Sequence, residues 1–307
     1  MAISIIICTY NPDIKILDGV FNSLKKALNY ISDYEVLVID NNSSNNFLSD
    51  VKISSYLNND YWKVISESKQ GLTPARLRGI VESKNELICF IDDDNFVEEN
   101  FFNVGIQIAN EYPFVGAWSG QVKLKFEVEP AQWTHNYWGM LVHRAFNGNK
   151  WSNLPHFSET MPCGAGLFVR KQVAEFYCKL HEQGKRNIQL DRSGGSLFSG
   201  GDDDLATCSI DIGLGIGLFH ELILEHYIPV KRTTREYFLK LAEGIATSSI
   251  ILTSFRNHVK PETTSFKRQL ANFVRDLFLS KIDKEIQRAV RRGEKLGYQI
   301  VKSNINS

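Results

Sequence analysis

Three consecutive aspartates, Asp92, Asp93 and Asp94, directly follow the apolar run Leu87–Ile91. Alternate side chains of an extended backbone point the same way, so Asp92 and Asp94 share a side. Paired carboxylates are ligands for hard cations such as Mg2+ and Mn2+, which keep part of their coordination shell for substrate phosphates. The alternative is a solvated acidic turn. Because the acids end a run that is typical of a buried strand, we predict a metal site here, with Mn2+ or Mg2+ as the cofactor.

Two other acidic segments could also carry chemistry. Asp40 ends the apolar run 35–39 and could accept hydrogen bonds from a nucleobase or ribose, or close an Asx turn. The segment Gly200–Asp204 places three aspartates after a glycine pair. One of them could be a general base that takes a proton from a hydroxyl. Taken alone, capping of a following helix is the simpler interpretation of these acids.

The elements that must position these residues follow from the apolar pattern. Four runs predict strands that are buried in a parallel sheet, at 3–8, 35–39, 62–66 and 87–91. Helical stripes at 13–31 and 73–81 lie between them, and this alternation predicts a doubly wound α/β sheet. Ligands of such sheets bind beyond the carboxyl ends of the strands. The polar segments 9–11, 40–42 and 92–94 should therefore meet in one crevice.

The second half of the chain has a looser pattern. We expect strands within 115–128 and at 167–170, a loop with a short helix over 133–151, and helices over 202–212 and 266–293. The glycines of 213–217 do not have the full GxGxxG spacing and follow a predicted helix, so Gly213 is expected to be a helix C-cap. The expected domains are 1–230, in two parts at about 1–112 and about 113–230, and a helical basic extension at 231–307.

Charge is distributed unevenly along a chain whose net charge is zero. Residues 256–307 contain twelve Lys or Arg and five Asp or Glu, so the rest of the chain is acidic. An amphipathic basic helix could lie on an anionic membrane or pack on the catalytic part, including in a homodimer. No apolar stretch was expected to approach the ~20 residues of a membrane span. Five scattered cysteines indicate a reducing compartment. We therefore expect a cytoplasmic protein, with peripheral contact at the inner face of the membrane as one option.

Taken in order, these segments resemble the inverting glycosyltransferases of family 2, which have the GT-A fold. The resemblance covers about residues 3–230, and it implies a nucleotide-binding part at about 1–112 and an acceptor part at about 113–230. The matching segments are Ile5–Asn11, Val36–Ser43, Gln70–Arg76, Asp92–Asp94 and Cys163–Gly166. The resemblance implies a GT-A α/β fold with a mostly parallel, doubly wound sheet flanked by helices, followed here by a C-terminal helical extension.

The resemblance also implies roles for the matched residues. Asp94 would be the direct metal ligand with Asp92 beside it, and His226 could contact the metal or the diphosphate. Asp202 would be the catalytic base. The donor nucleotide-sugar would be bound by Thr9, Tyr10, Asn11, Asp40, Gln70, Gly71, Arg76, Asp92 and Asp93. The acceptor side would contain Trp133, Trp138, Gly164, Ala165, Gly166 and Asp203. For the two tryptophans, packing of a long loop is the simpler role.

Two departures from the family pattern matter for function. Gly201 stands where the family usually has a glutamate before the base, so the choice among Asp202, Asp203 and Asp204 is left open. Leu77 stands where an asparagine is common. The Gln-x-x-Arg-Trp motif of processive members does not occur, which favours addition of a single sugar.

The expected function is metal-dependent, inverting transfer of one sugar from a nucleoside-diphosphate sugar to an acceptor hydroxyl. The acceptor would be a glycan or lipid-linked glycan of bacterial surface polysaccharide assembly, and nucleic acid is not an expected partner. Two alternatives are a catalytically silent nucleotide-sugar-binding or scaffold protein and a nucleotidyltransferase. The latter normally has a basic, glycine-rich loop after its first strand, which the segment 9–12 is not.

Overall fold

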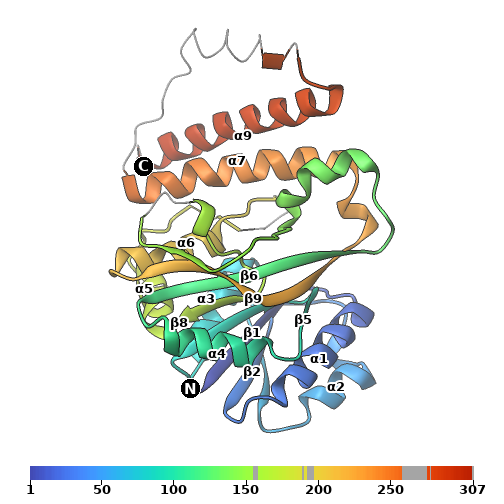
Figure 1. Ribbon diagram of the computed structural model, residues 1–307, viewed down its shortest axis with the longest axis vertical. Coiled ribbons are helices and arrows are strands. Elements are labelled where there is room, and N and C mark those ends of the chain that lie inside the picture. Colours follow the sequence, from blue (N-terminus) through green and yellow to red (C-terminus); the bar gives the residue numbers. More distant parts are fainter. Residues whose placement is uncertain (155–157, 189, 192–196, 258–274, 277, 306–307) are drawn as a thin grey trace.

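The structure, a computed structural model, describes residues 1–154, 158–188, 190–191, 197–257, 275–276 and 278–305 (Figure 1). Its strands form one mixed sheet in the order β3-β2-β1-β4-β8-β6-β9-β5, with β7 paired to β9. The strands are β1 (Ile3–Thr9), β2 (Tyr34–Asp40), β3 (Trp62–Ser66), β4 (Leu87–Asp92), β5 (Asn95–Val97), β6 (Val115–Phe126), β7 (Lys150–Ser152), β8 (Leu167–Arg170) and β9 (Gly215–Ile228).

Helices surround this sheet. They are α1 (Ile14–Leu28), α2 (Val51–Leu57), α3 (Leu72–Glu82), α4 (Phe101–Glu111), α5 (Lys171–Glu182), α6 (Gly201–Asp211), α7 (Arg235–Asn257) and α9 (Lys281–Ile305). Short 3-10 turns are η1 (Phe47–Ser49), η2 (Gln132–Leu141), η3 (Ser158–Thr160) and η4 (Val230–Arg232).

The first half of the sheet is parallel, with β1 between β2 and β4 and with β3 beside β2. Side chains of these strands alternate between two helical layers, because successive residues face opposite sides. Ile5 and Ile7 pack with α1, α2 and α4, whereas Ile6 packs with α3, α5 and α6. Burial on both faces explains why these strands are continuous apolar runs. The expected α/β fold class is confirmed.

The second half of the sheet is mixed. The strand β8 lies antiparallel between β4 and β6, and β6 pairs in parallel with β9. Gly213 ends α6 with φ +85°, and its N–H donates to the Ile210 carbonyl at 3.0 Å. This is the expected C-cap. The sequence analysis did not predict the 14-residue strand β9 that follows, because its glycine-rich start lacks a strand pattern.

The helices α7 and α9 lie side by side at the end of the molecule opposite α1 and α2 (Figure 1). Glycines of α9 let the two backbones approach closely: a Cβ on Gly293 would lie 2.2 Å from the Glu243 carbonyl oxygen. Thr247 Oγ1 donates to the Gly293 carbonyl at 3.1 Å. Ile286 and Ala289 of α9 are buried in a cluster with α7. The apolar stripe of α9 therefore packs on the protein. Residues 266–274 of the expected helix lie outside the described residues.

By length and composition alone, α7 could cross a membrane, since Arg235–Arg256 has a mean hydropathy of 1.2. This differs from the expectation from sequence that no apolar stretch approaches the length of a membrane span. In the structure 44% of the apolar window is buried inside the molecule. A core helix that packs on other helices has the same composition, so this finding is weak support for a membrane span.

Candidate functional site

A cavity of about 730 Å³ lies beyond the carboxyl ends of β1, β2 and β4. The expected convergence of these strand ends is therefore found. Twelve of the residues assigned to the site from sequence line this cavity: Thr9, Tyr10, Gln70, Gly71, Arg76, Asp92, Asp93, Asp94, Gly164, Ala165, Asp202 and His226.

Three neighbouring carboxylates, those of Asp92, Asp93 and Asp94, line one side of the cavity and are called the aspartate floor below. Cys8 of β1 pairs with Asp92 of β4, which brings the ends of the two strands together. Thr9 Oγ1 donates to Asp93 Oδ2 at 2.5 Å. Burial, and after it the neighbouring Asp94, raises the pKa of Asp93 to about 7. The same two causes raise the pKa of Asp92. A cation at this floor would offset the repulsion among the three carboxylates.

Asp94 shares its carboxylate with two residues from the end of β9 and from η4. Arg232 Nη1 donates to Asp94 Oδ2 at 2.9 Å and lies 3.3 Å from His226 Nε2. His226 Nε2 lies 3.5 Å from the same Asp94 oxygen. His226 Nδ1 lies 3.1 Å from the Leu141 carbonyl oxygen, which can only accept, so Nδ1 donates to it and Nε2 is the ring nitrogen beside Asp94 and Arg232. The guanidinium of Arg232 thus lies between two groups that could bind a metal ion.

These residues fit a metal site that substrate would have to complete. Two neighbouring ligands of one Mg2+ ion lie about 3 Å apart, since each is about 2.1 Å from the ion. The 3.5 Å separation of Asp94 Oδ2 and His226 Nε2 is close to this value. Within the described residues, no three His, Cys, Asp or Glu side chains are grouped to hold a metal. Oxygens of a bound diphosphate would therefore have to supply the remaining ligands.

The wall formed by α3 is tied to the end of β2 by Asn41. Its Nδ2 donates to the carbonyls of Glu67 and Lys69, at 3.1 and 2.8 Å, and its Oδ1 accepts from the Gly71 N–H at 2.7 Å. Gly71 has φ +133°, a conformation that favours glycine, at the N-cap of α3. The turn that begins α3 is therefore fixed against the strand end, and α3 presents Arg76 to the cavity.

The three aspartates of α6 have different surroundings. Asp202 lines the cavity, and its Oδ2 accepts from the Gly164 N–H at 2.6 Å. Asp204 is 1% exposed and accepts from Arg186 Nε and Arg256 Nη1, both at 2.7 Å. Asp203 does not line the cavity, and burial followed by Asp202 raises its pKa to about 8. Of the three, only Asp202 lines the same cavity as Asp92, Asp93 and Asp94.

The other residues that the sequence analysis assigned to the site do not line this cavity. Asn11 Oδ1 accepts from the N–H groups of Ser44 and Asn45, and Asp40 Oδ1 accepts from the Ser43 N–H at 3.0 Å, a local cap of the backbone three residues on. Gly166, with φ +68°, packs on Leu224 and Phe101.

Trp133 packs against α7, and Trp138 packs on β6 and within η2. The rings of Trp133 and Phe238 of α7 are edge-to-face with centroids 5.4 Å apart. Trp138 packs on Phe126, and its Nε1 donates to Thr134 Oγ1 at 3.1 Å. Packing, the simpler interpretation from sequence, is what the structure shows for both residues.

Eleven lining residues were not assigned from sequence, and four of them have charged or amide side chains: Asn41, Asp191, Lys231 and Arg232. Asn41 was part of a recognised polar cluster, but its neighbour Asp40 was chosen. Lys231 and Arg232 lie just beyond the expected domain boundary at 230. Two basic residues so soon after His226 could have indicated that they bind phosphate in the same site. Asp191 lies in a polar stretch without apolar periodicity, so no sequence pattern marked it.

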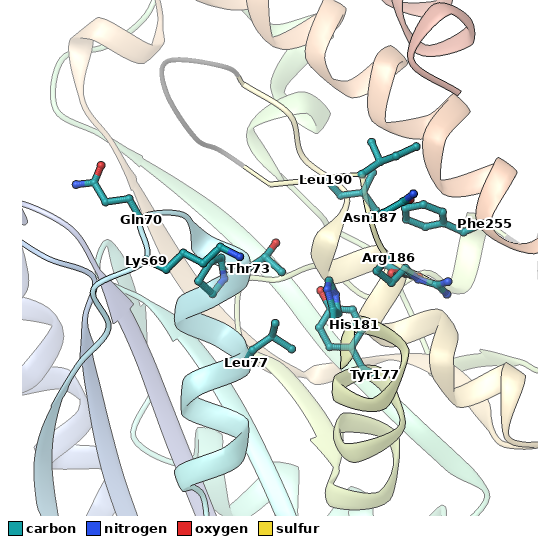
Figure 2. Close-up of a pocket in the computed structure, with 13 residues that line it drawn as sticks. Lys69, Gln70, Thr73, Leu77, Tyr177, His181, Arg186, Asn187, Leu190 and Phe255 are labelled. Atoms are coloured by element: carbon teal, nitrogen blue, oxygen red, sulfur yellow. Dashed lines mark hydrogen bonds and ion pairs between the residues drawn. The ribbon is translucent and has the colours of Figure 1, made fainter. Parts of the chain in front are cut away.

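A second cavity of about 250 Å³ lies between α3, α5, the residues 186–188 and 190, and the end of α7. Figure 2 shows Thr73 and Leu77 of α3 opposite Tyr177 and His181 of α5 across it. Burial lowers the pKa of His181, and its Nε2 has no hydrogen-bond partner among the described residues. The two cavities share Gln70, but neither Asp202 nor the aspartate floor lines the smaller one.

Comparison with known proteins decides the family. Residues 4–175 match the model of glycosyl transferase family 2. The chain belongs to this family, and it is a glycosyltransferase. EpsH of Bacillus subtilis (strain 168), whose name assigns it to the glycosyltransferases, is 26% identical over 110 residues. That match covers 36% of this chain and 31% of EpsH.

Crystal structures show the same fold for this family 2 chain. The structure of S. aureus TarS 1–349 in complex with UDP-GlcNAc is similar with a TM-score of 0.52, and the complex with UDP with a TM-score of 0.51. Sequence identity to both is 15%, and the matches cover 100% of this chain and 92% and 91% of the two TarS chains.

Proposed function

We propose that this glycosyltransferase transfers a single sugar from a nucleoside-diphosphate sugar to an acceptor hydroxyl, with inversion at the anomeric carbon. The supporting observation is that Asp202 and the aspartate floor, Asp92 to Asp94, line one cavity. A leaving diphosphate at the floor and a base at Asp202 would lie on different sides of the sugar between them. This arrangement favours attack from the side opposite the leaving group.

The donor is proposed to be a uridine diphosphate sugar. The TarS structures of the same fold are complexes with UDP and UDP-GlcNAc, which supports this choice of nucleotide. The proposed diphosphate position lies near Arg76, Lys231 and Arg232, three cationic residues of the cavity lining. Tyr10 is 51% exposed and lines the same cavity, so its ring is available to stack on a base.

Mn2+ or Mg2+ is the proposed cofactor. Five carboxylates and three Lys or Arg side chains line the cavity, an imbalance that disfavours a diphosphate unless a cation accompanies it. Asp94 would hold the ion, with either Asp92 or His226 Nε2 as the second protein ligand. When bound, the cation would supply charge neutralisation for the leaving diphosphate. Arg232 contacts the same Asp94 oxygen and would have to share it or move to the diphosphate.

Asp202 is the proposed base. Its Oδ2 is oriented by the Gly164 N–H, and a side chain on residue 164 would meet this oxygen, since a Cβ there would lie 2.8 Å from it. The carboxylate takes the proton of the acceptor hydroxyl while the hydroxyl oxygen bonds to the anomeric carbon. The bond from this carbon to the diphosphate oxygen breaks at the same time, and the diphosphate keeps the electron pair.

The proposed acceptor is a glycan or lipid-linked glycan, reached at the cytoplasmic face of the membrane. The exposed stripe of α9 supports an electrostatic contact with anionic lipid, because its cationic residues project from one side of the helix and its apolar stripe is covered by α7. The exposed residues of this stripe are Lys281, Arg288, Arg292, Lys295 and Lys302. Sedimentation with anionic vesicles should weaken when these five are replaced by Gln, and unchanged sedimentation would remove this contact.

A screen of nucleotide-sugars tests the central proposal. We expect a uridine diphosphate sugar to raise the unfolding temperature more with Mn2+ than with EDTA, and release of UDP to require an acceptor. The anomeric configuration of the product, read from NMR coupling constants, tests inversion. Retention of configuration, or stabilisation by no nucleotide-sugar, would remove the proposal.

A further inference from the structure

Asp191 connects the two sides of the cavity. It is 2% exposed and lies ten residues before the start of α6. Its carboxylate accepts from Arg76 Nη1 at 3.1 Å, from Thr73 Oγ1 at 2.7 Å and from the Gly201 N–H at 3.2 Å. Two of these donors belong to α3, and the third is the first residue of α6. We propose that Asp191 is a positioning residue for the transfer, which fixes Arg76 of α3 relative to the base Asp202 of α6.

Asp191 is not itself suited to take a proton from the acceptor. Its Oδ2 accepts from Thr73 and Arg76, and its Oδ1 accepts from Arg76 and from the Gly201 N–H. Both oxygens are therefore occupied by donors, and the carboxylate is engaged in an ion pair with Arg76 at 3.1 Å. Asp202 has a different environment, since the one hydrogen bond described for its carboxylate is that of the Gly164 N–H.

The absence of a side chain at residue 201 makes room for this carboxylate. A Cβ on Gly201 would lie 2.2 Å from Asp191 Oδ2 and 2.5 Å from Asp191 Cγ. The carboxyl carbon of a glutamate lies about 2.5 Å from its own Cβ, by standard bond lengths and angles. A glutamate at 201 could therefore place its carboxylate close to the position that Asp191 occupies. Asp191 and Gly201 therefore form a complementary pair. Asp191 supplies the carboxylate, and the missing side chain of Gly201 leaves the space that this carboxylate fills.

The contact with Asp191 positions the guanidinium of Arg76 at the edge of the cavity. Asp191 binds its Nη1, and its Nη2 lies 3.2 Å from the position of a Cβ on Gly164, at the edge of the cavity. Asp202 Oδ2 lies 2.8 Å from the same point. Arg76 Nη2 and the carboxylate of the base thus both lie next to Gly164. Without Asp191, nothing described on this side would hold the Arg76 guanidinium in that orientation or tie the first turn of α6 to α3.

A double-mutant cycle tests this inference, which rests on the proposed function. Asp191→Ala should lower kcat by about 10²-fold, the loss that small displacements of reacting groups can cause. Gly201→Glu should also lower kcat, because its side chain meets Asp191. The double variant Asp191→Ala/Gly201→Glu should regain about tenfold over the weaker single variant, a coupling within the range for contacting residues. Asp191→Asn, which keeps the volume, covers the case in which Asp191→Ala does not fold.

Two measurements separate positioning from a purely structural role. Unfolding temperatures of all variants are measured beside kcat and the KM for donor. The matched control is Asp276→Asn, which breaks the ion pair with Arg291 on α9, away from the cavity, and should leave kcat unchanged. Coupling in unfolding temperature without coupling in kcat, or additive effects on kcat, would overturn the inference. A wild-type enzyme that transfers no sugar would instead contradict the proposed function.

Discussion

The aspartates of α6 allow a prediction that separates stability from catalysis. Asp204 is 1% exposed and bridges Arg186 and Arg256, whose side chains are 5% and 12% exposed. Removing one member of a buried ion pair costs about 3–5 kcal/mol, because the partner charge stays buried. We therefore expect Asp204→Asn to lower the free energy of unfolding by about 3 kcal/mol or more, which is a large part of the about 5–15 kcal/mol of a typical domain.

Asp202→Asn should have the opposite profile. The described hydrogen bond of its carboxylate, with the Gly164 N–H at 2.6 Å, can be kept by the asparagine oxygen, so stability should change by about 1 kcal/mol or less. Loss of a positioned base should lower kcat by about 10²–10⁴-fold. Urea unfolding and release of nucleoside diphosphate are measured on both purified variants at the same temperature. An Asp204→Asn enzyme that is stable but inactive, beside an active Asp202→Asn enzyme, would refute this assignment of the base.

Three further predictions concern charge. Asp94→Ala should abolish the extra stabilisation by Mn2+ in the presence of donor, measured by thermal unfolding, and leave the fold intact. Arg232→Ala should tighten Mn2+ binding without donor in calorimetry, because a cation at Asp94 Oδ2 is removed, and should raise the KM for donor. Because the pKa of Asp203 is raised to about 8, the folded protein keeps a proton on this carboxyl that the unfolded chain releases above about pH 4. The free energy of unfolding therefore falls as pH rises from about 4 to about 8. Asp203→Asn should make the fall in unfolding free energy between pH 5 and 8 shallower, by up to about 1.4 kcal/mol per pH unit, in urea titrations.

The first half of the fold could be predicted from sequence because each strand there is buried on both faces. Continuous apolar runs such as 3–8 and 87–91 have no other simple interpretation when turns and helical stripes lie between them. The strand β9 has the weaker pattern of an alternating strand, and three glycines at 213, 215 and 217 interrupt its start. Its pairing with β6 is long-range, and local patterns contain no information about such partners.

Site residues could be predicted from sequence where a polar side chain directly follows a recognisable strand pattern in the same short segment. The aspartates 92–94 follow a strand directly, so the end of that strand fixed their place. Asp191 could not be found in this way, because its three partners are 118, 115 and 10 residues away along the chain. Asp40 and Asn41 differ by one residue, and the alternation of an extended strand decides which of the two faces the cavity.

The C-terminal extension takes part in building the site and is more than an appendage. Lys231 and Arg232 line the cavity at its start. Further along, α7 supports the segment that leads into α6: the Ser199 N–H donates to Ser248 Oγ at 3.0 Å, and Arg256 binds Asp204 at 2.7 Å. These contacts cross the boundary expected at residue 230. The small and polar residues on the buried side of α7 also explain how a helix of membrane-like hydropathy can pack within the fold. Since α9 covers another side of α7, deleting α9 would disturb α7, and through it the first turn of α6 that carries the proposed base.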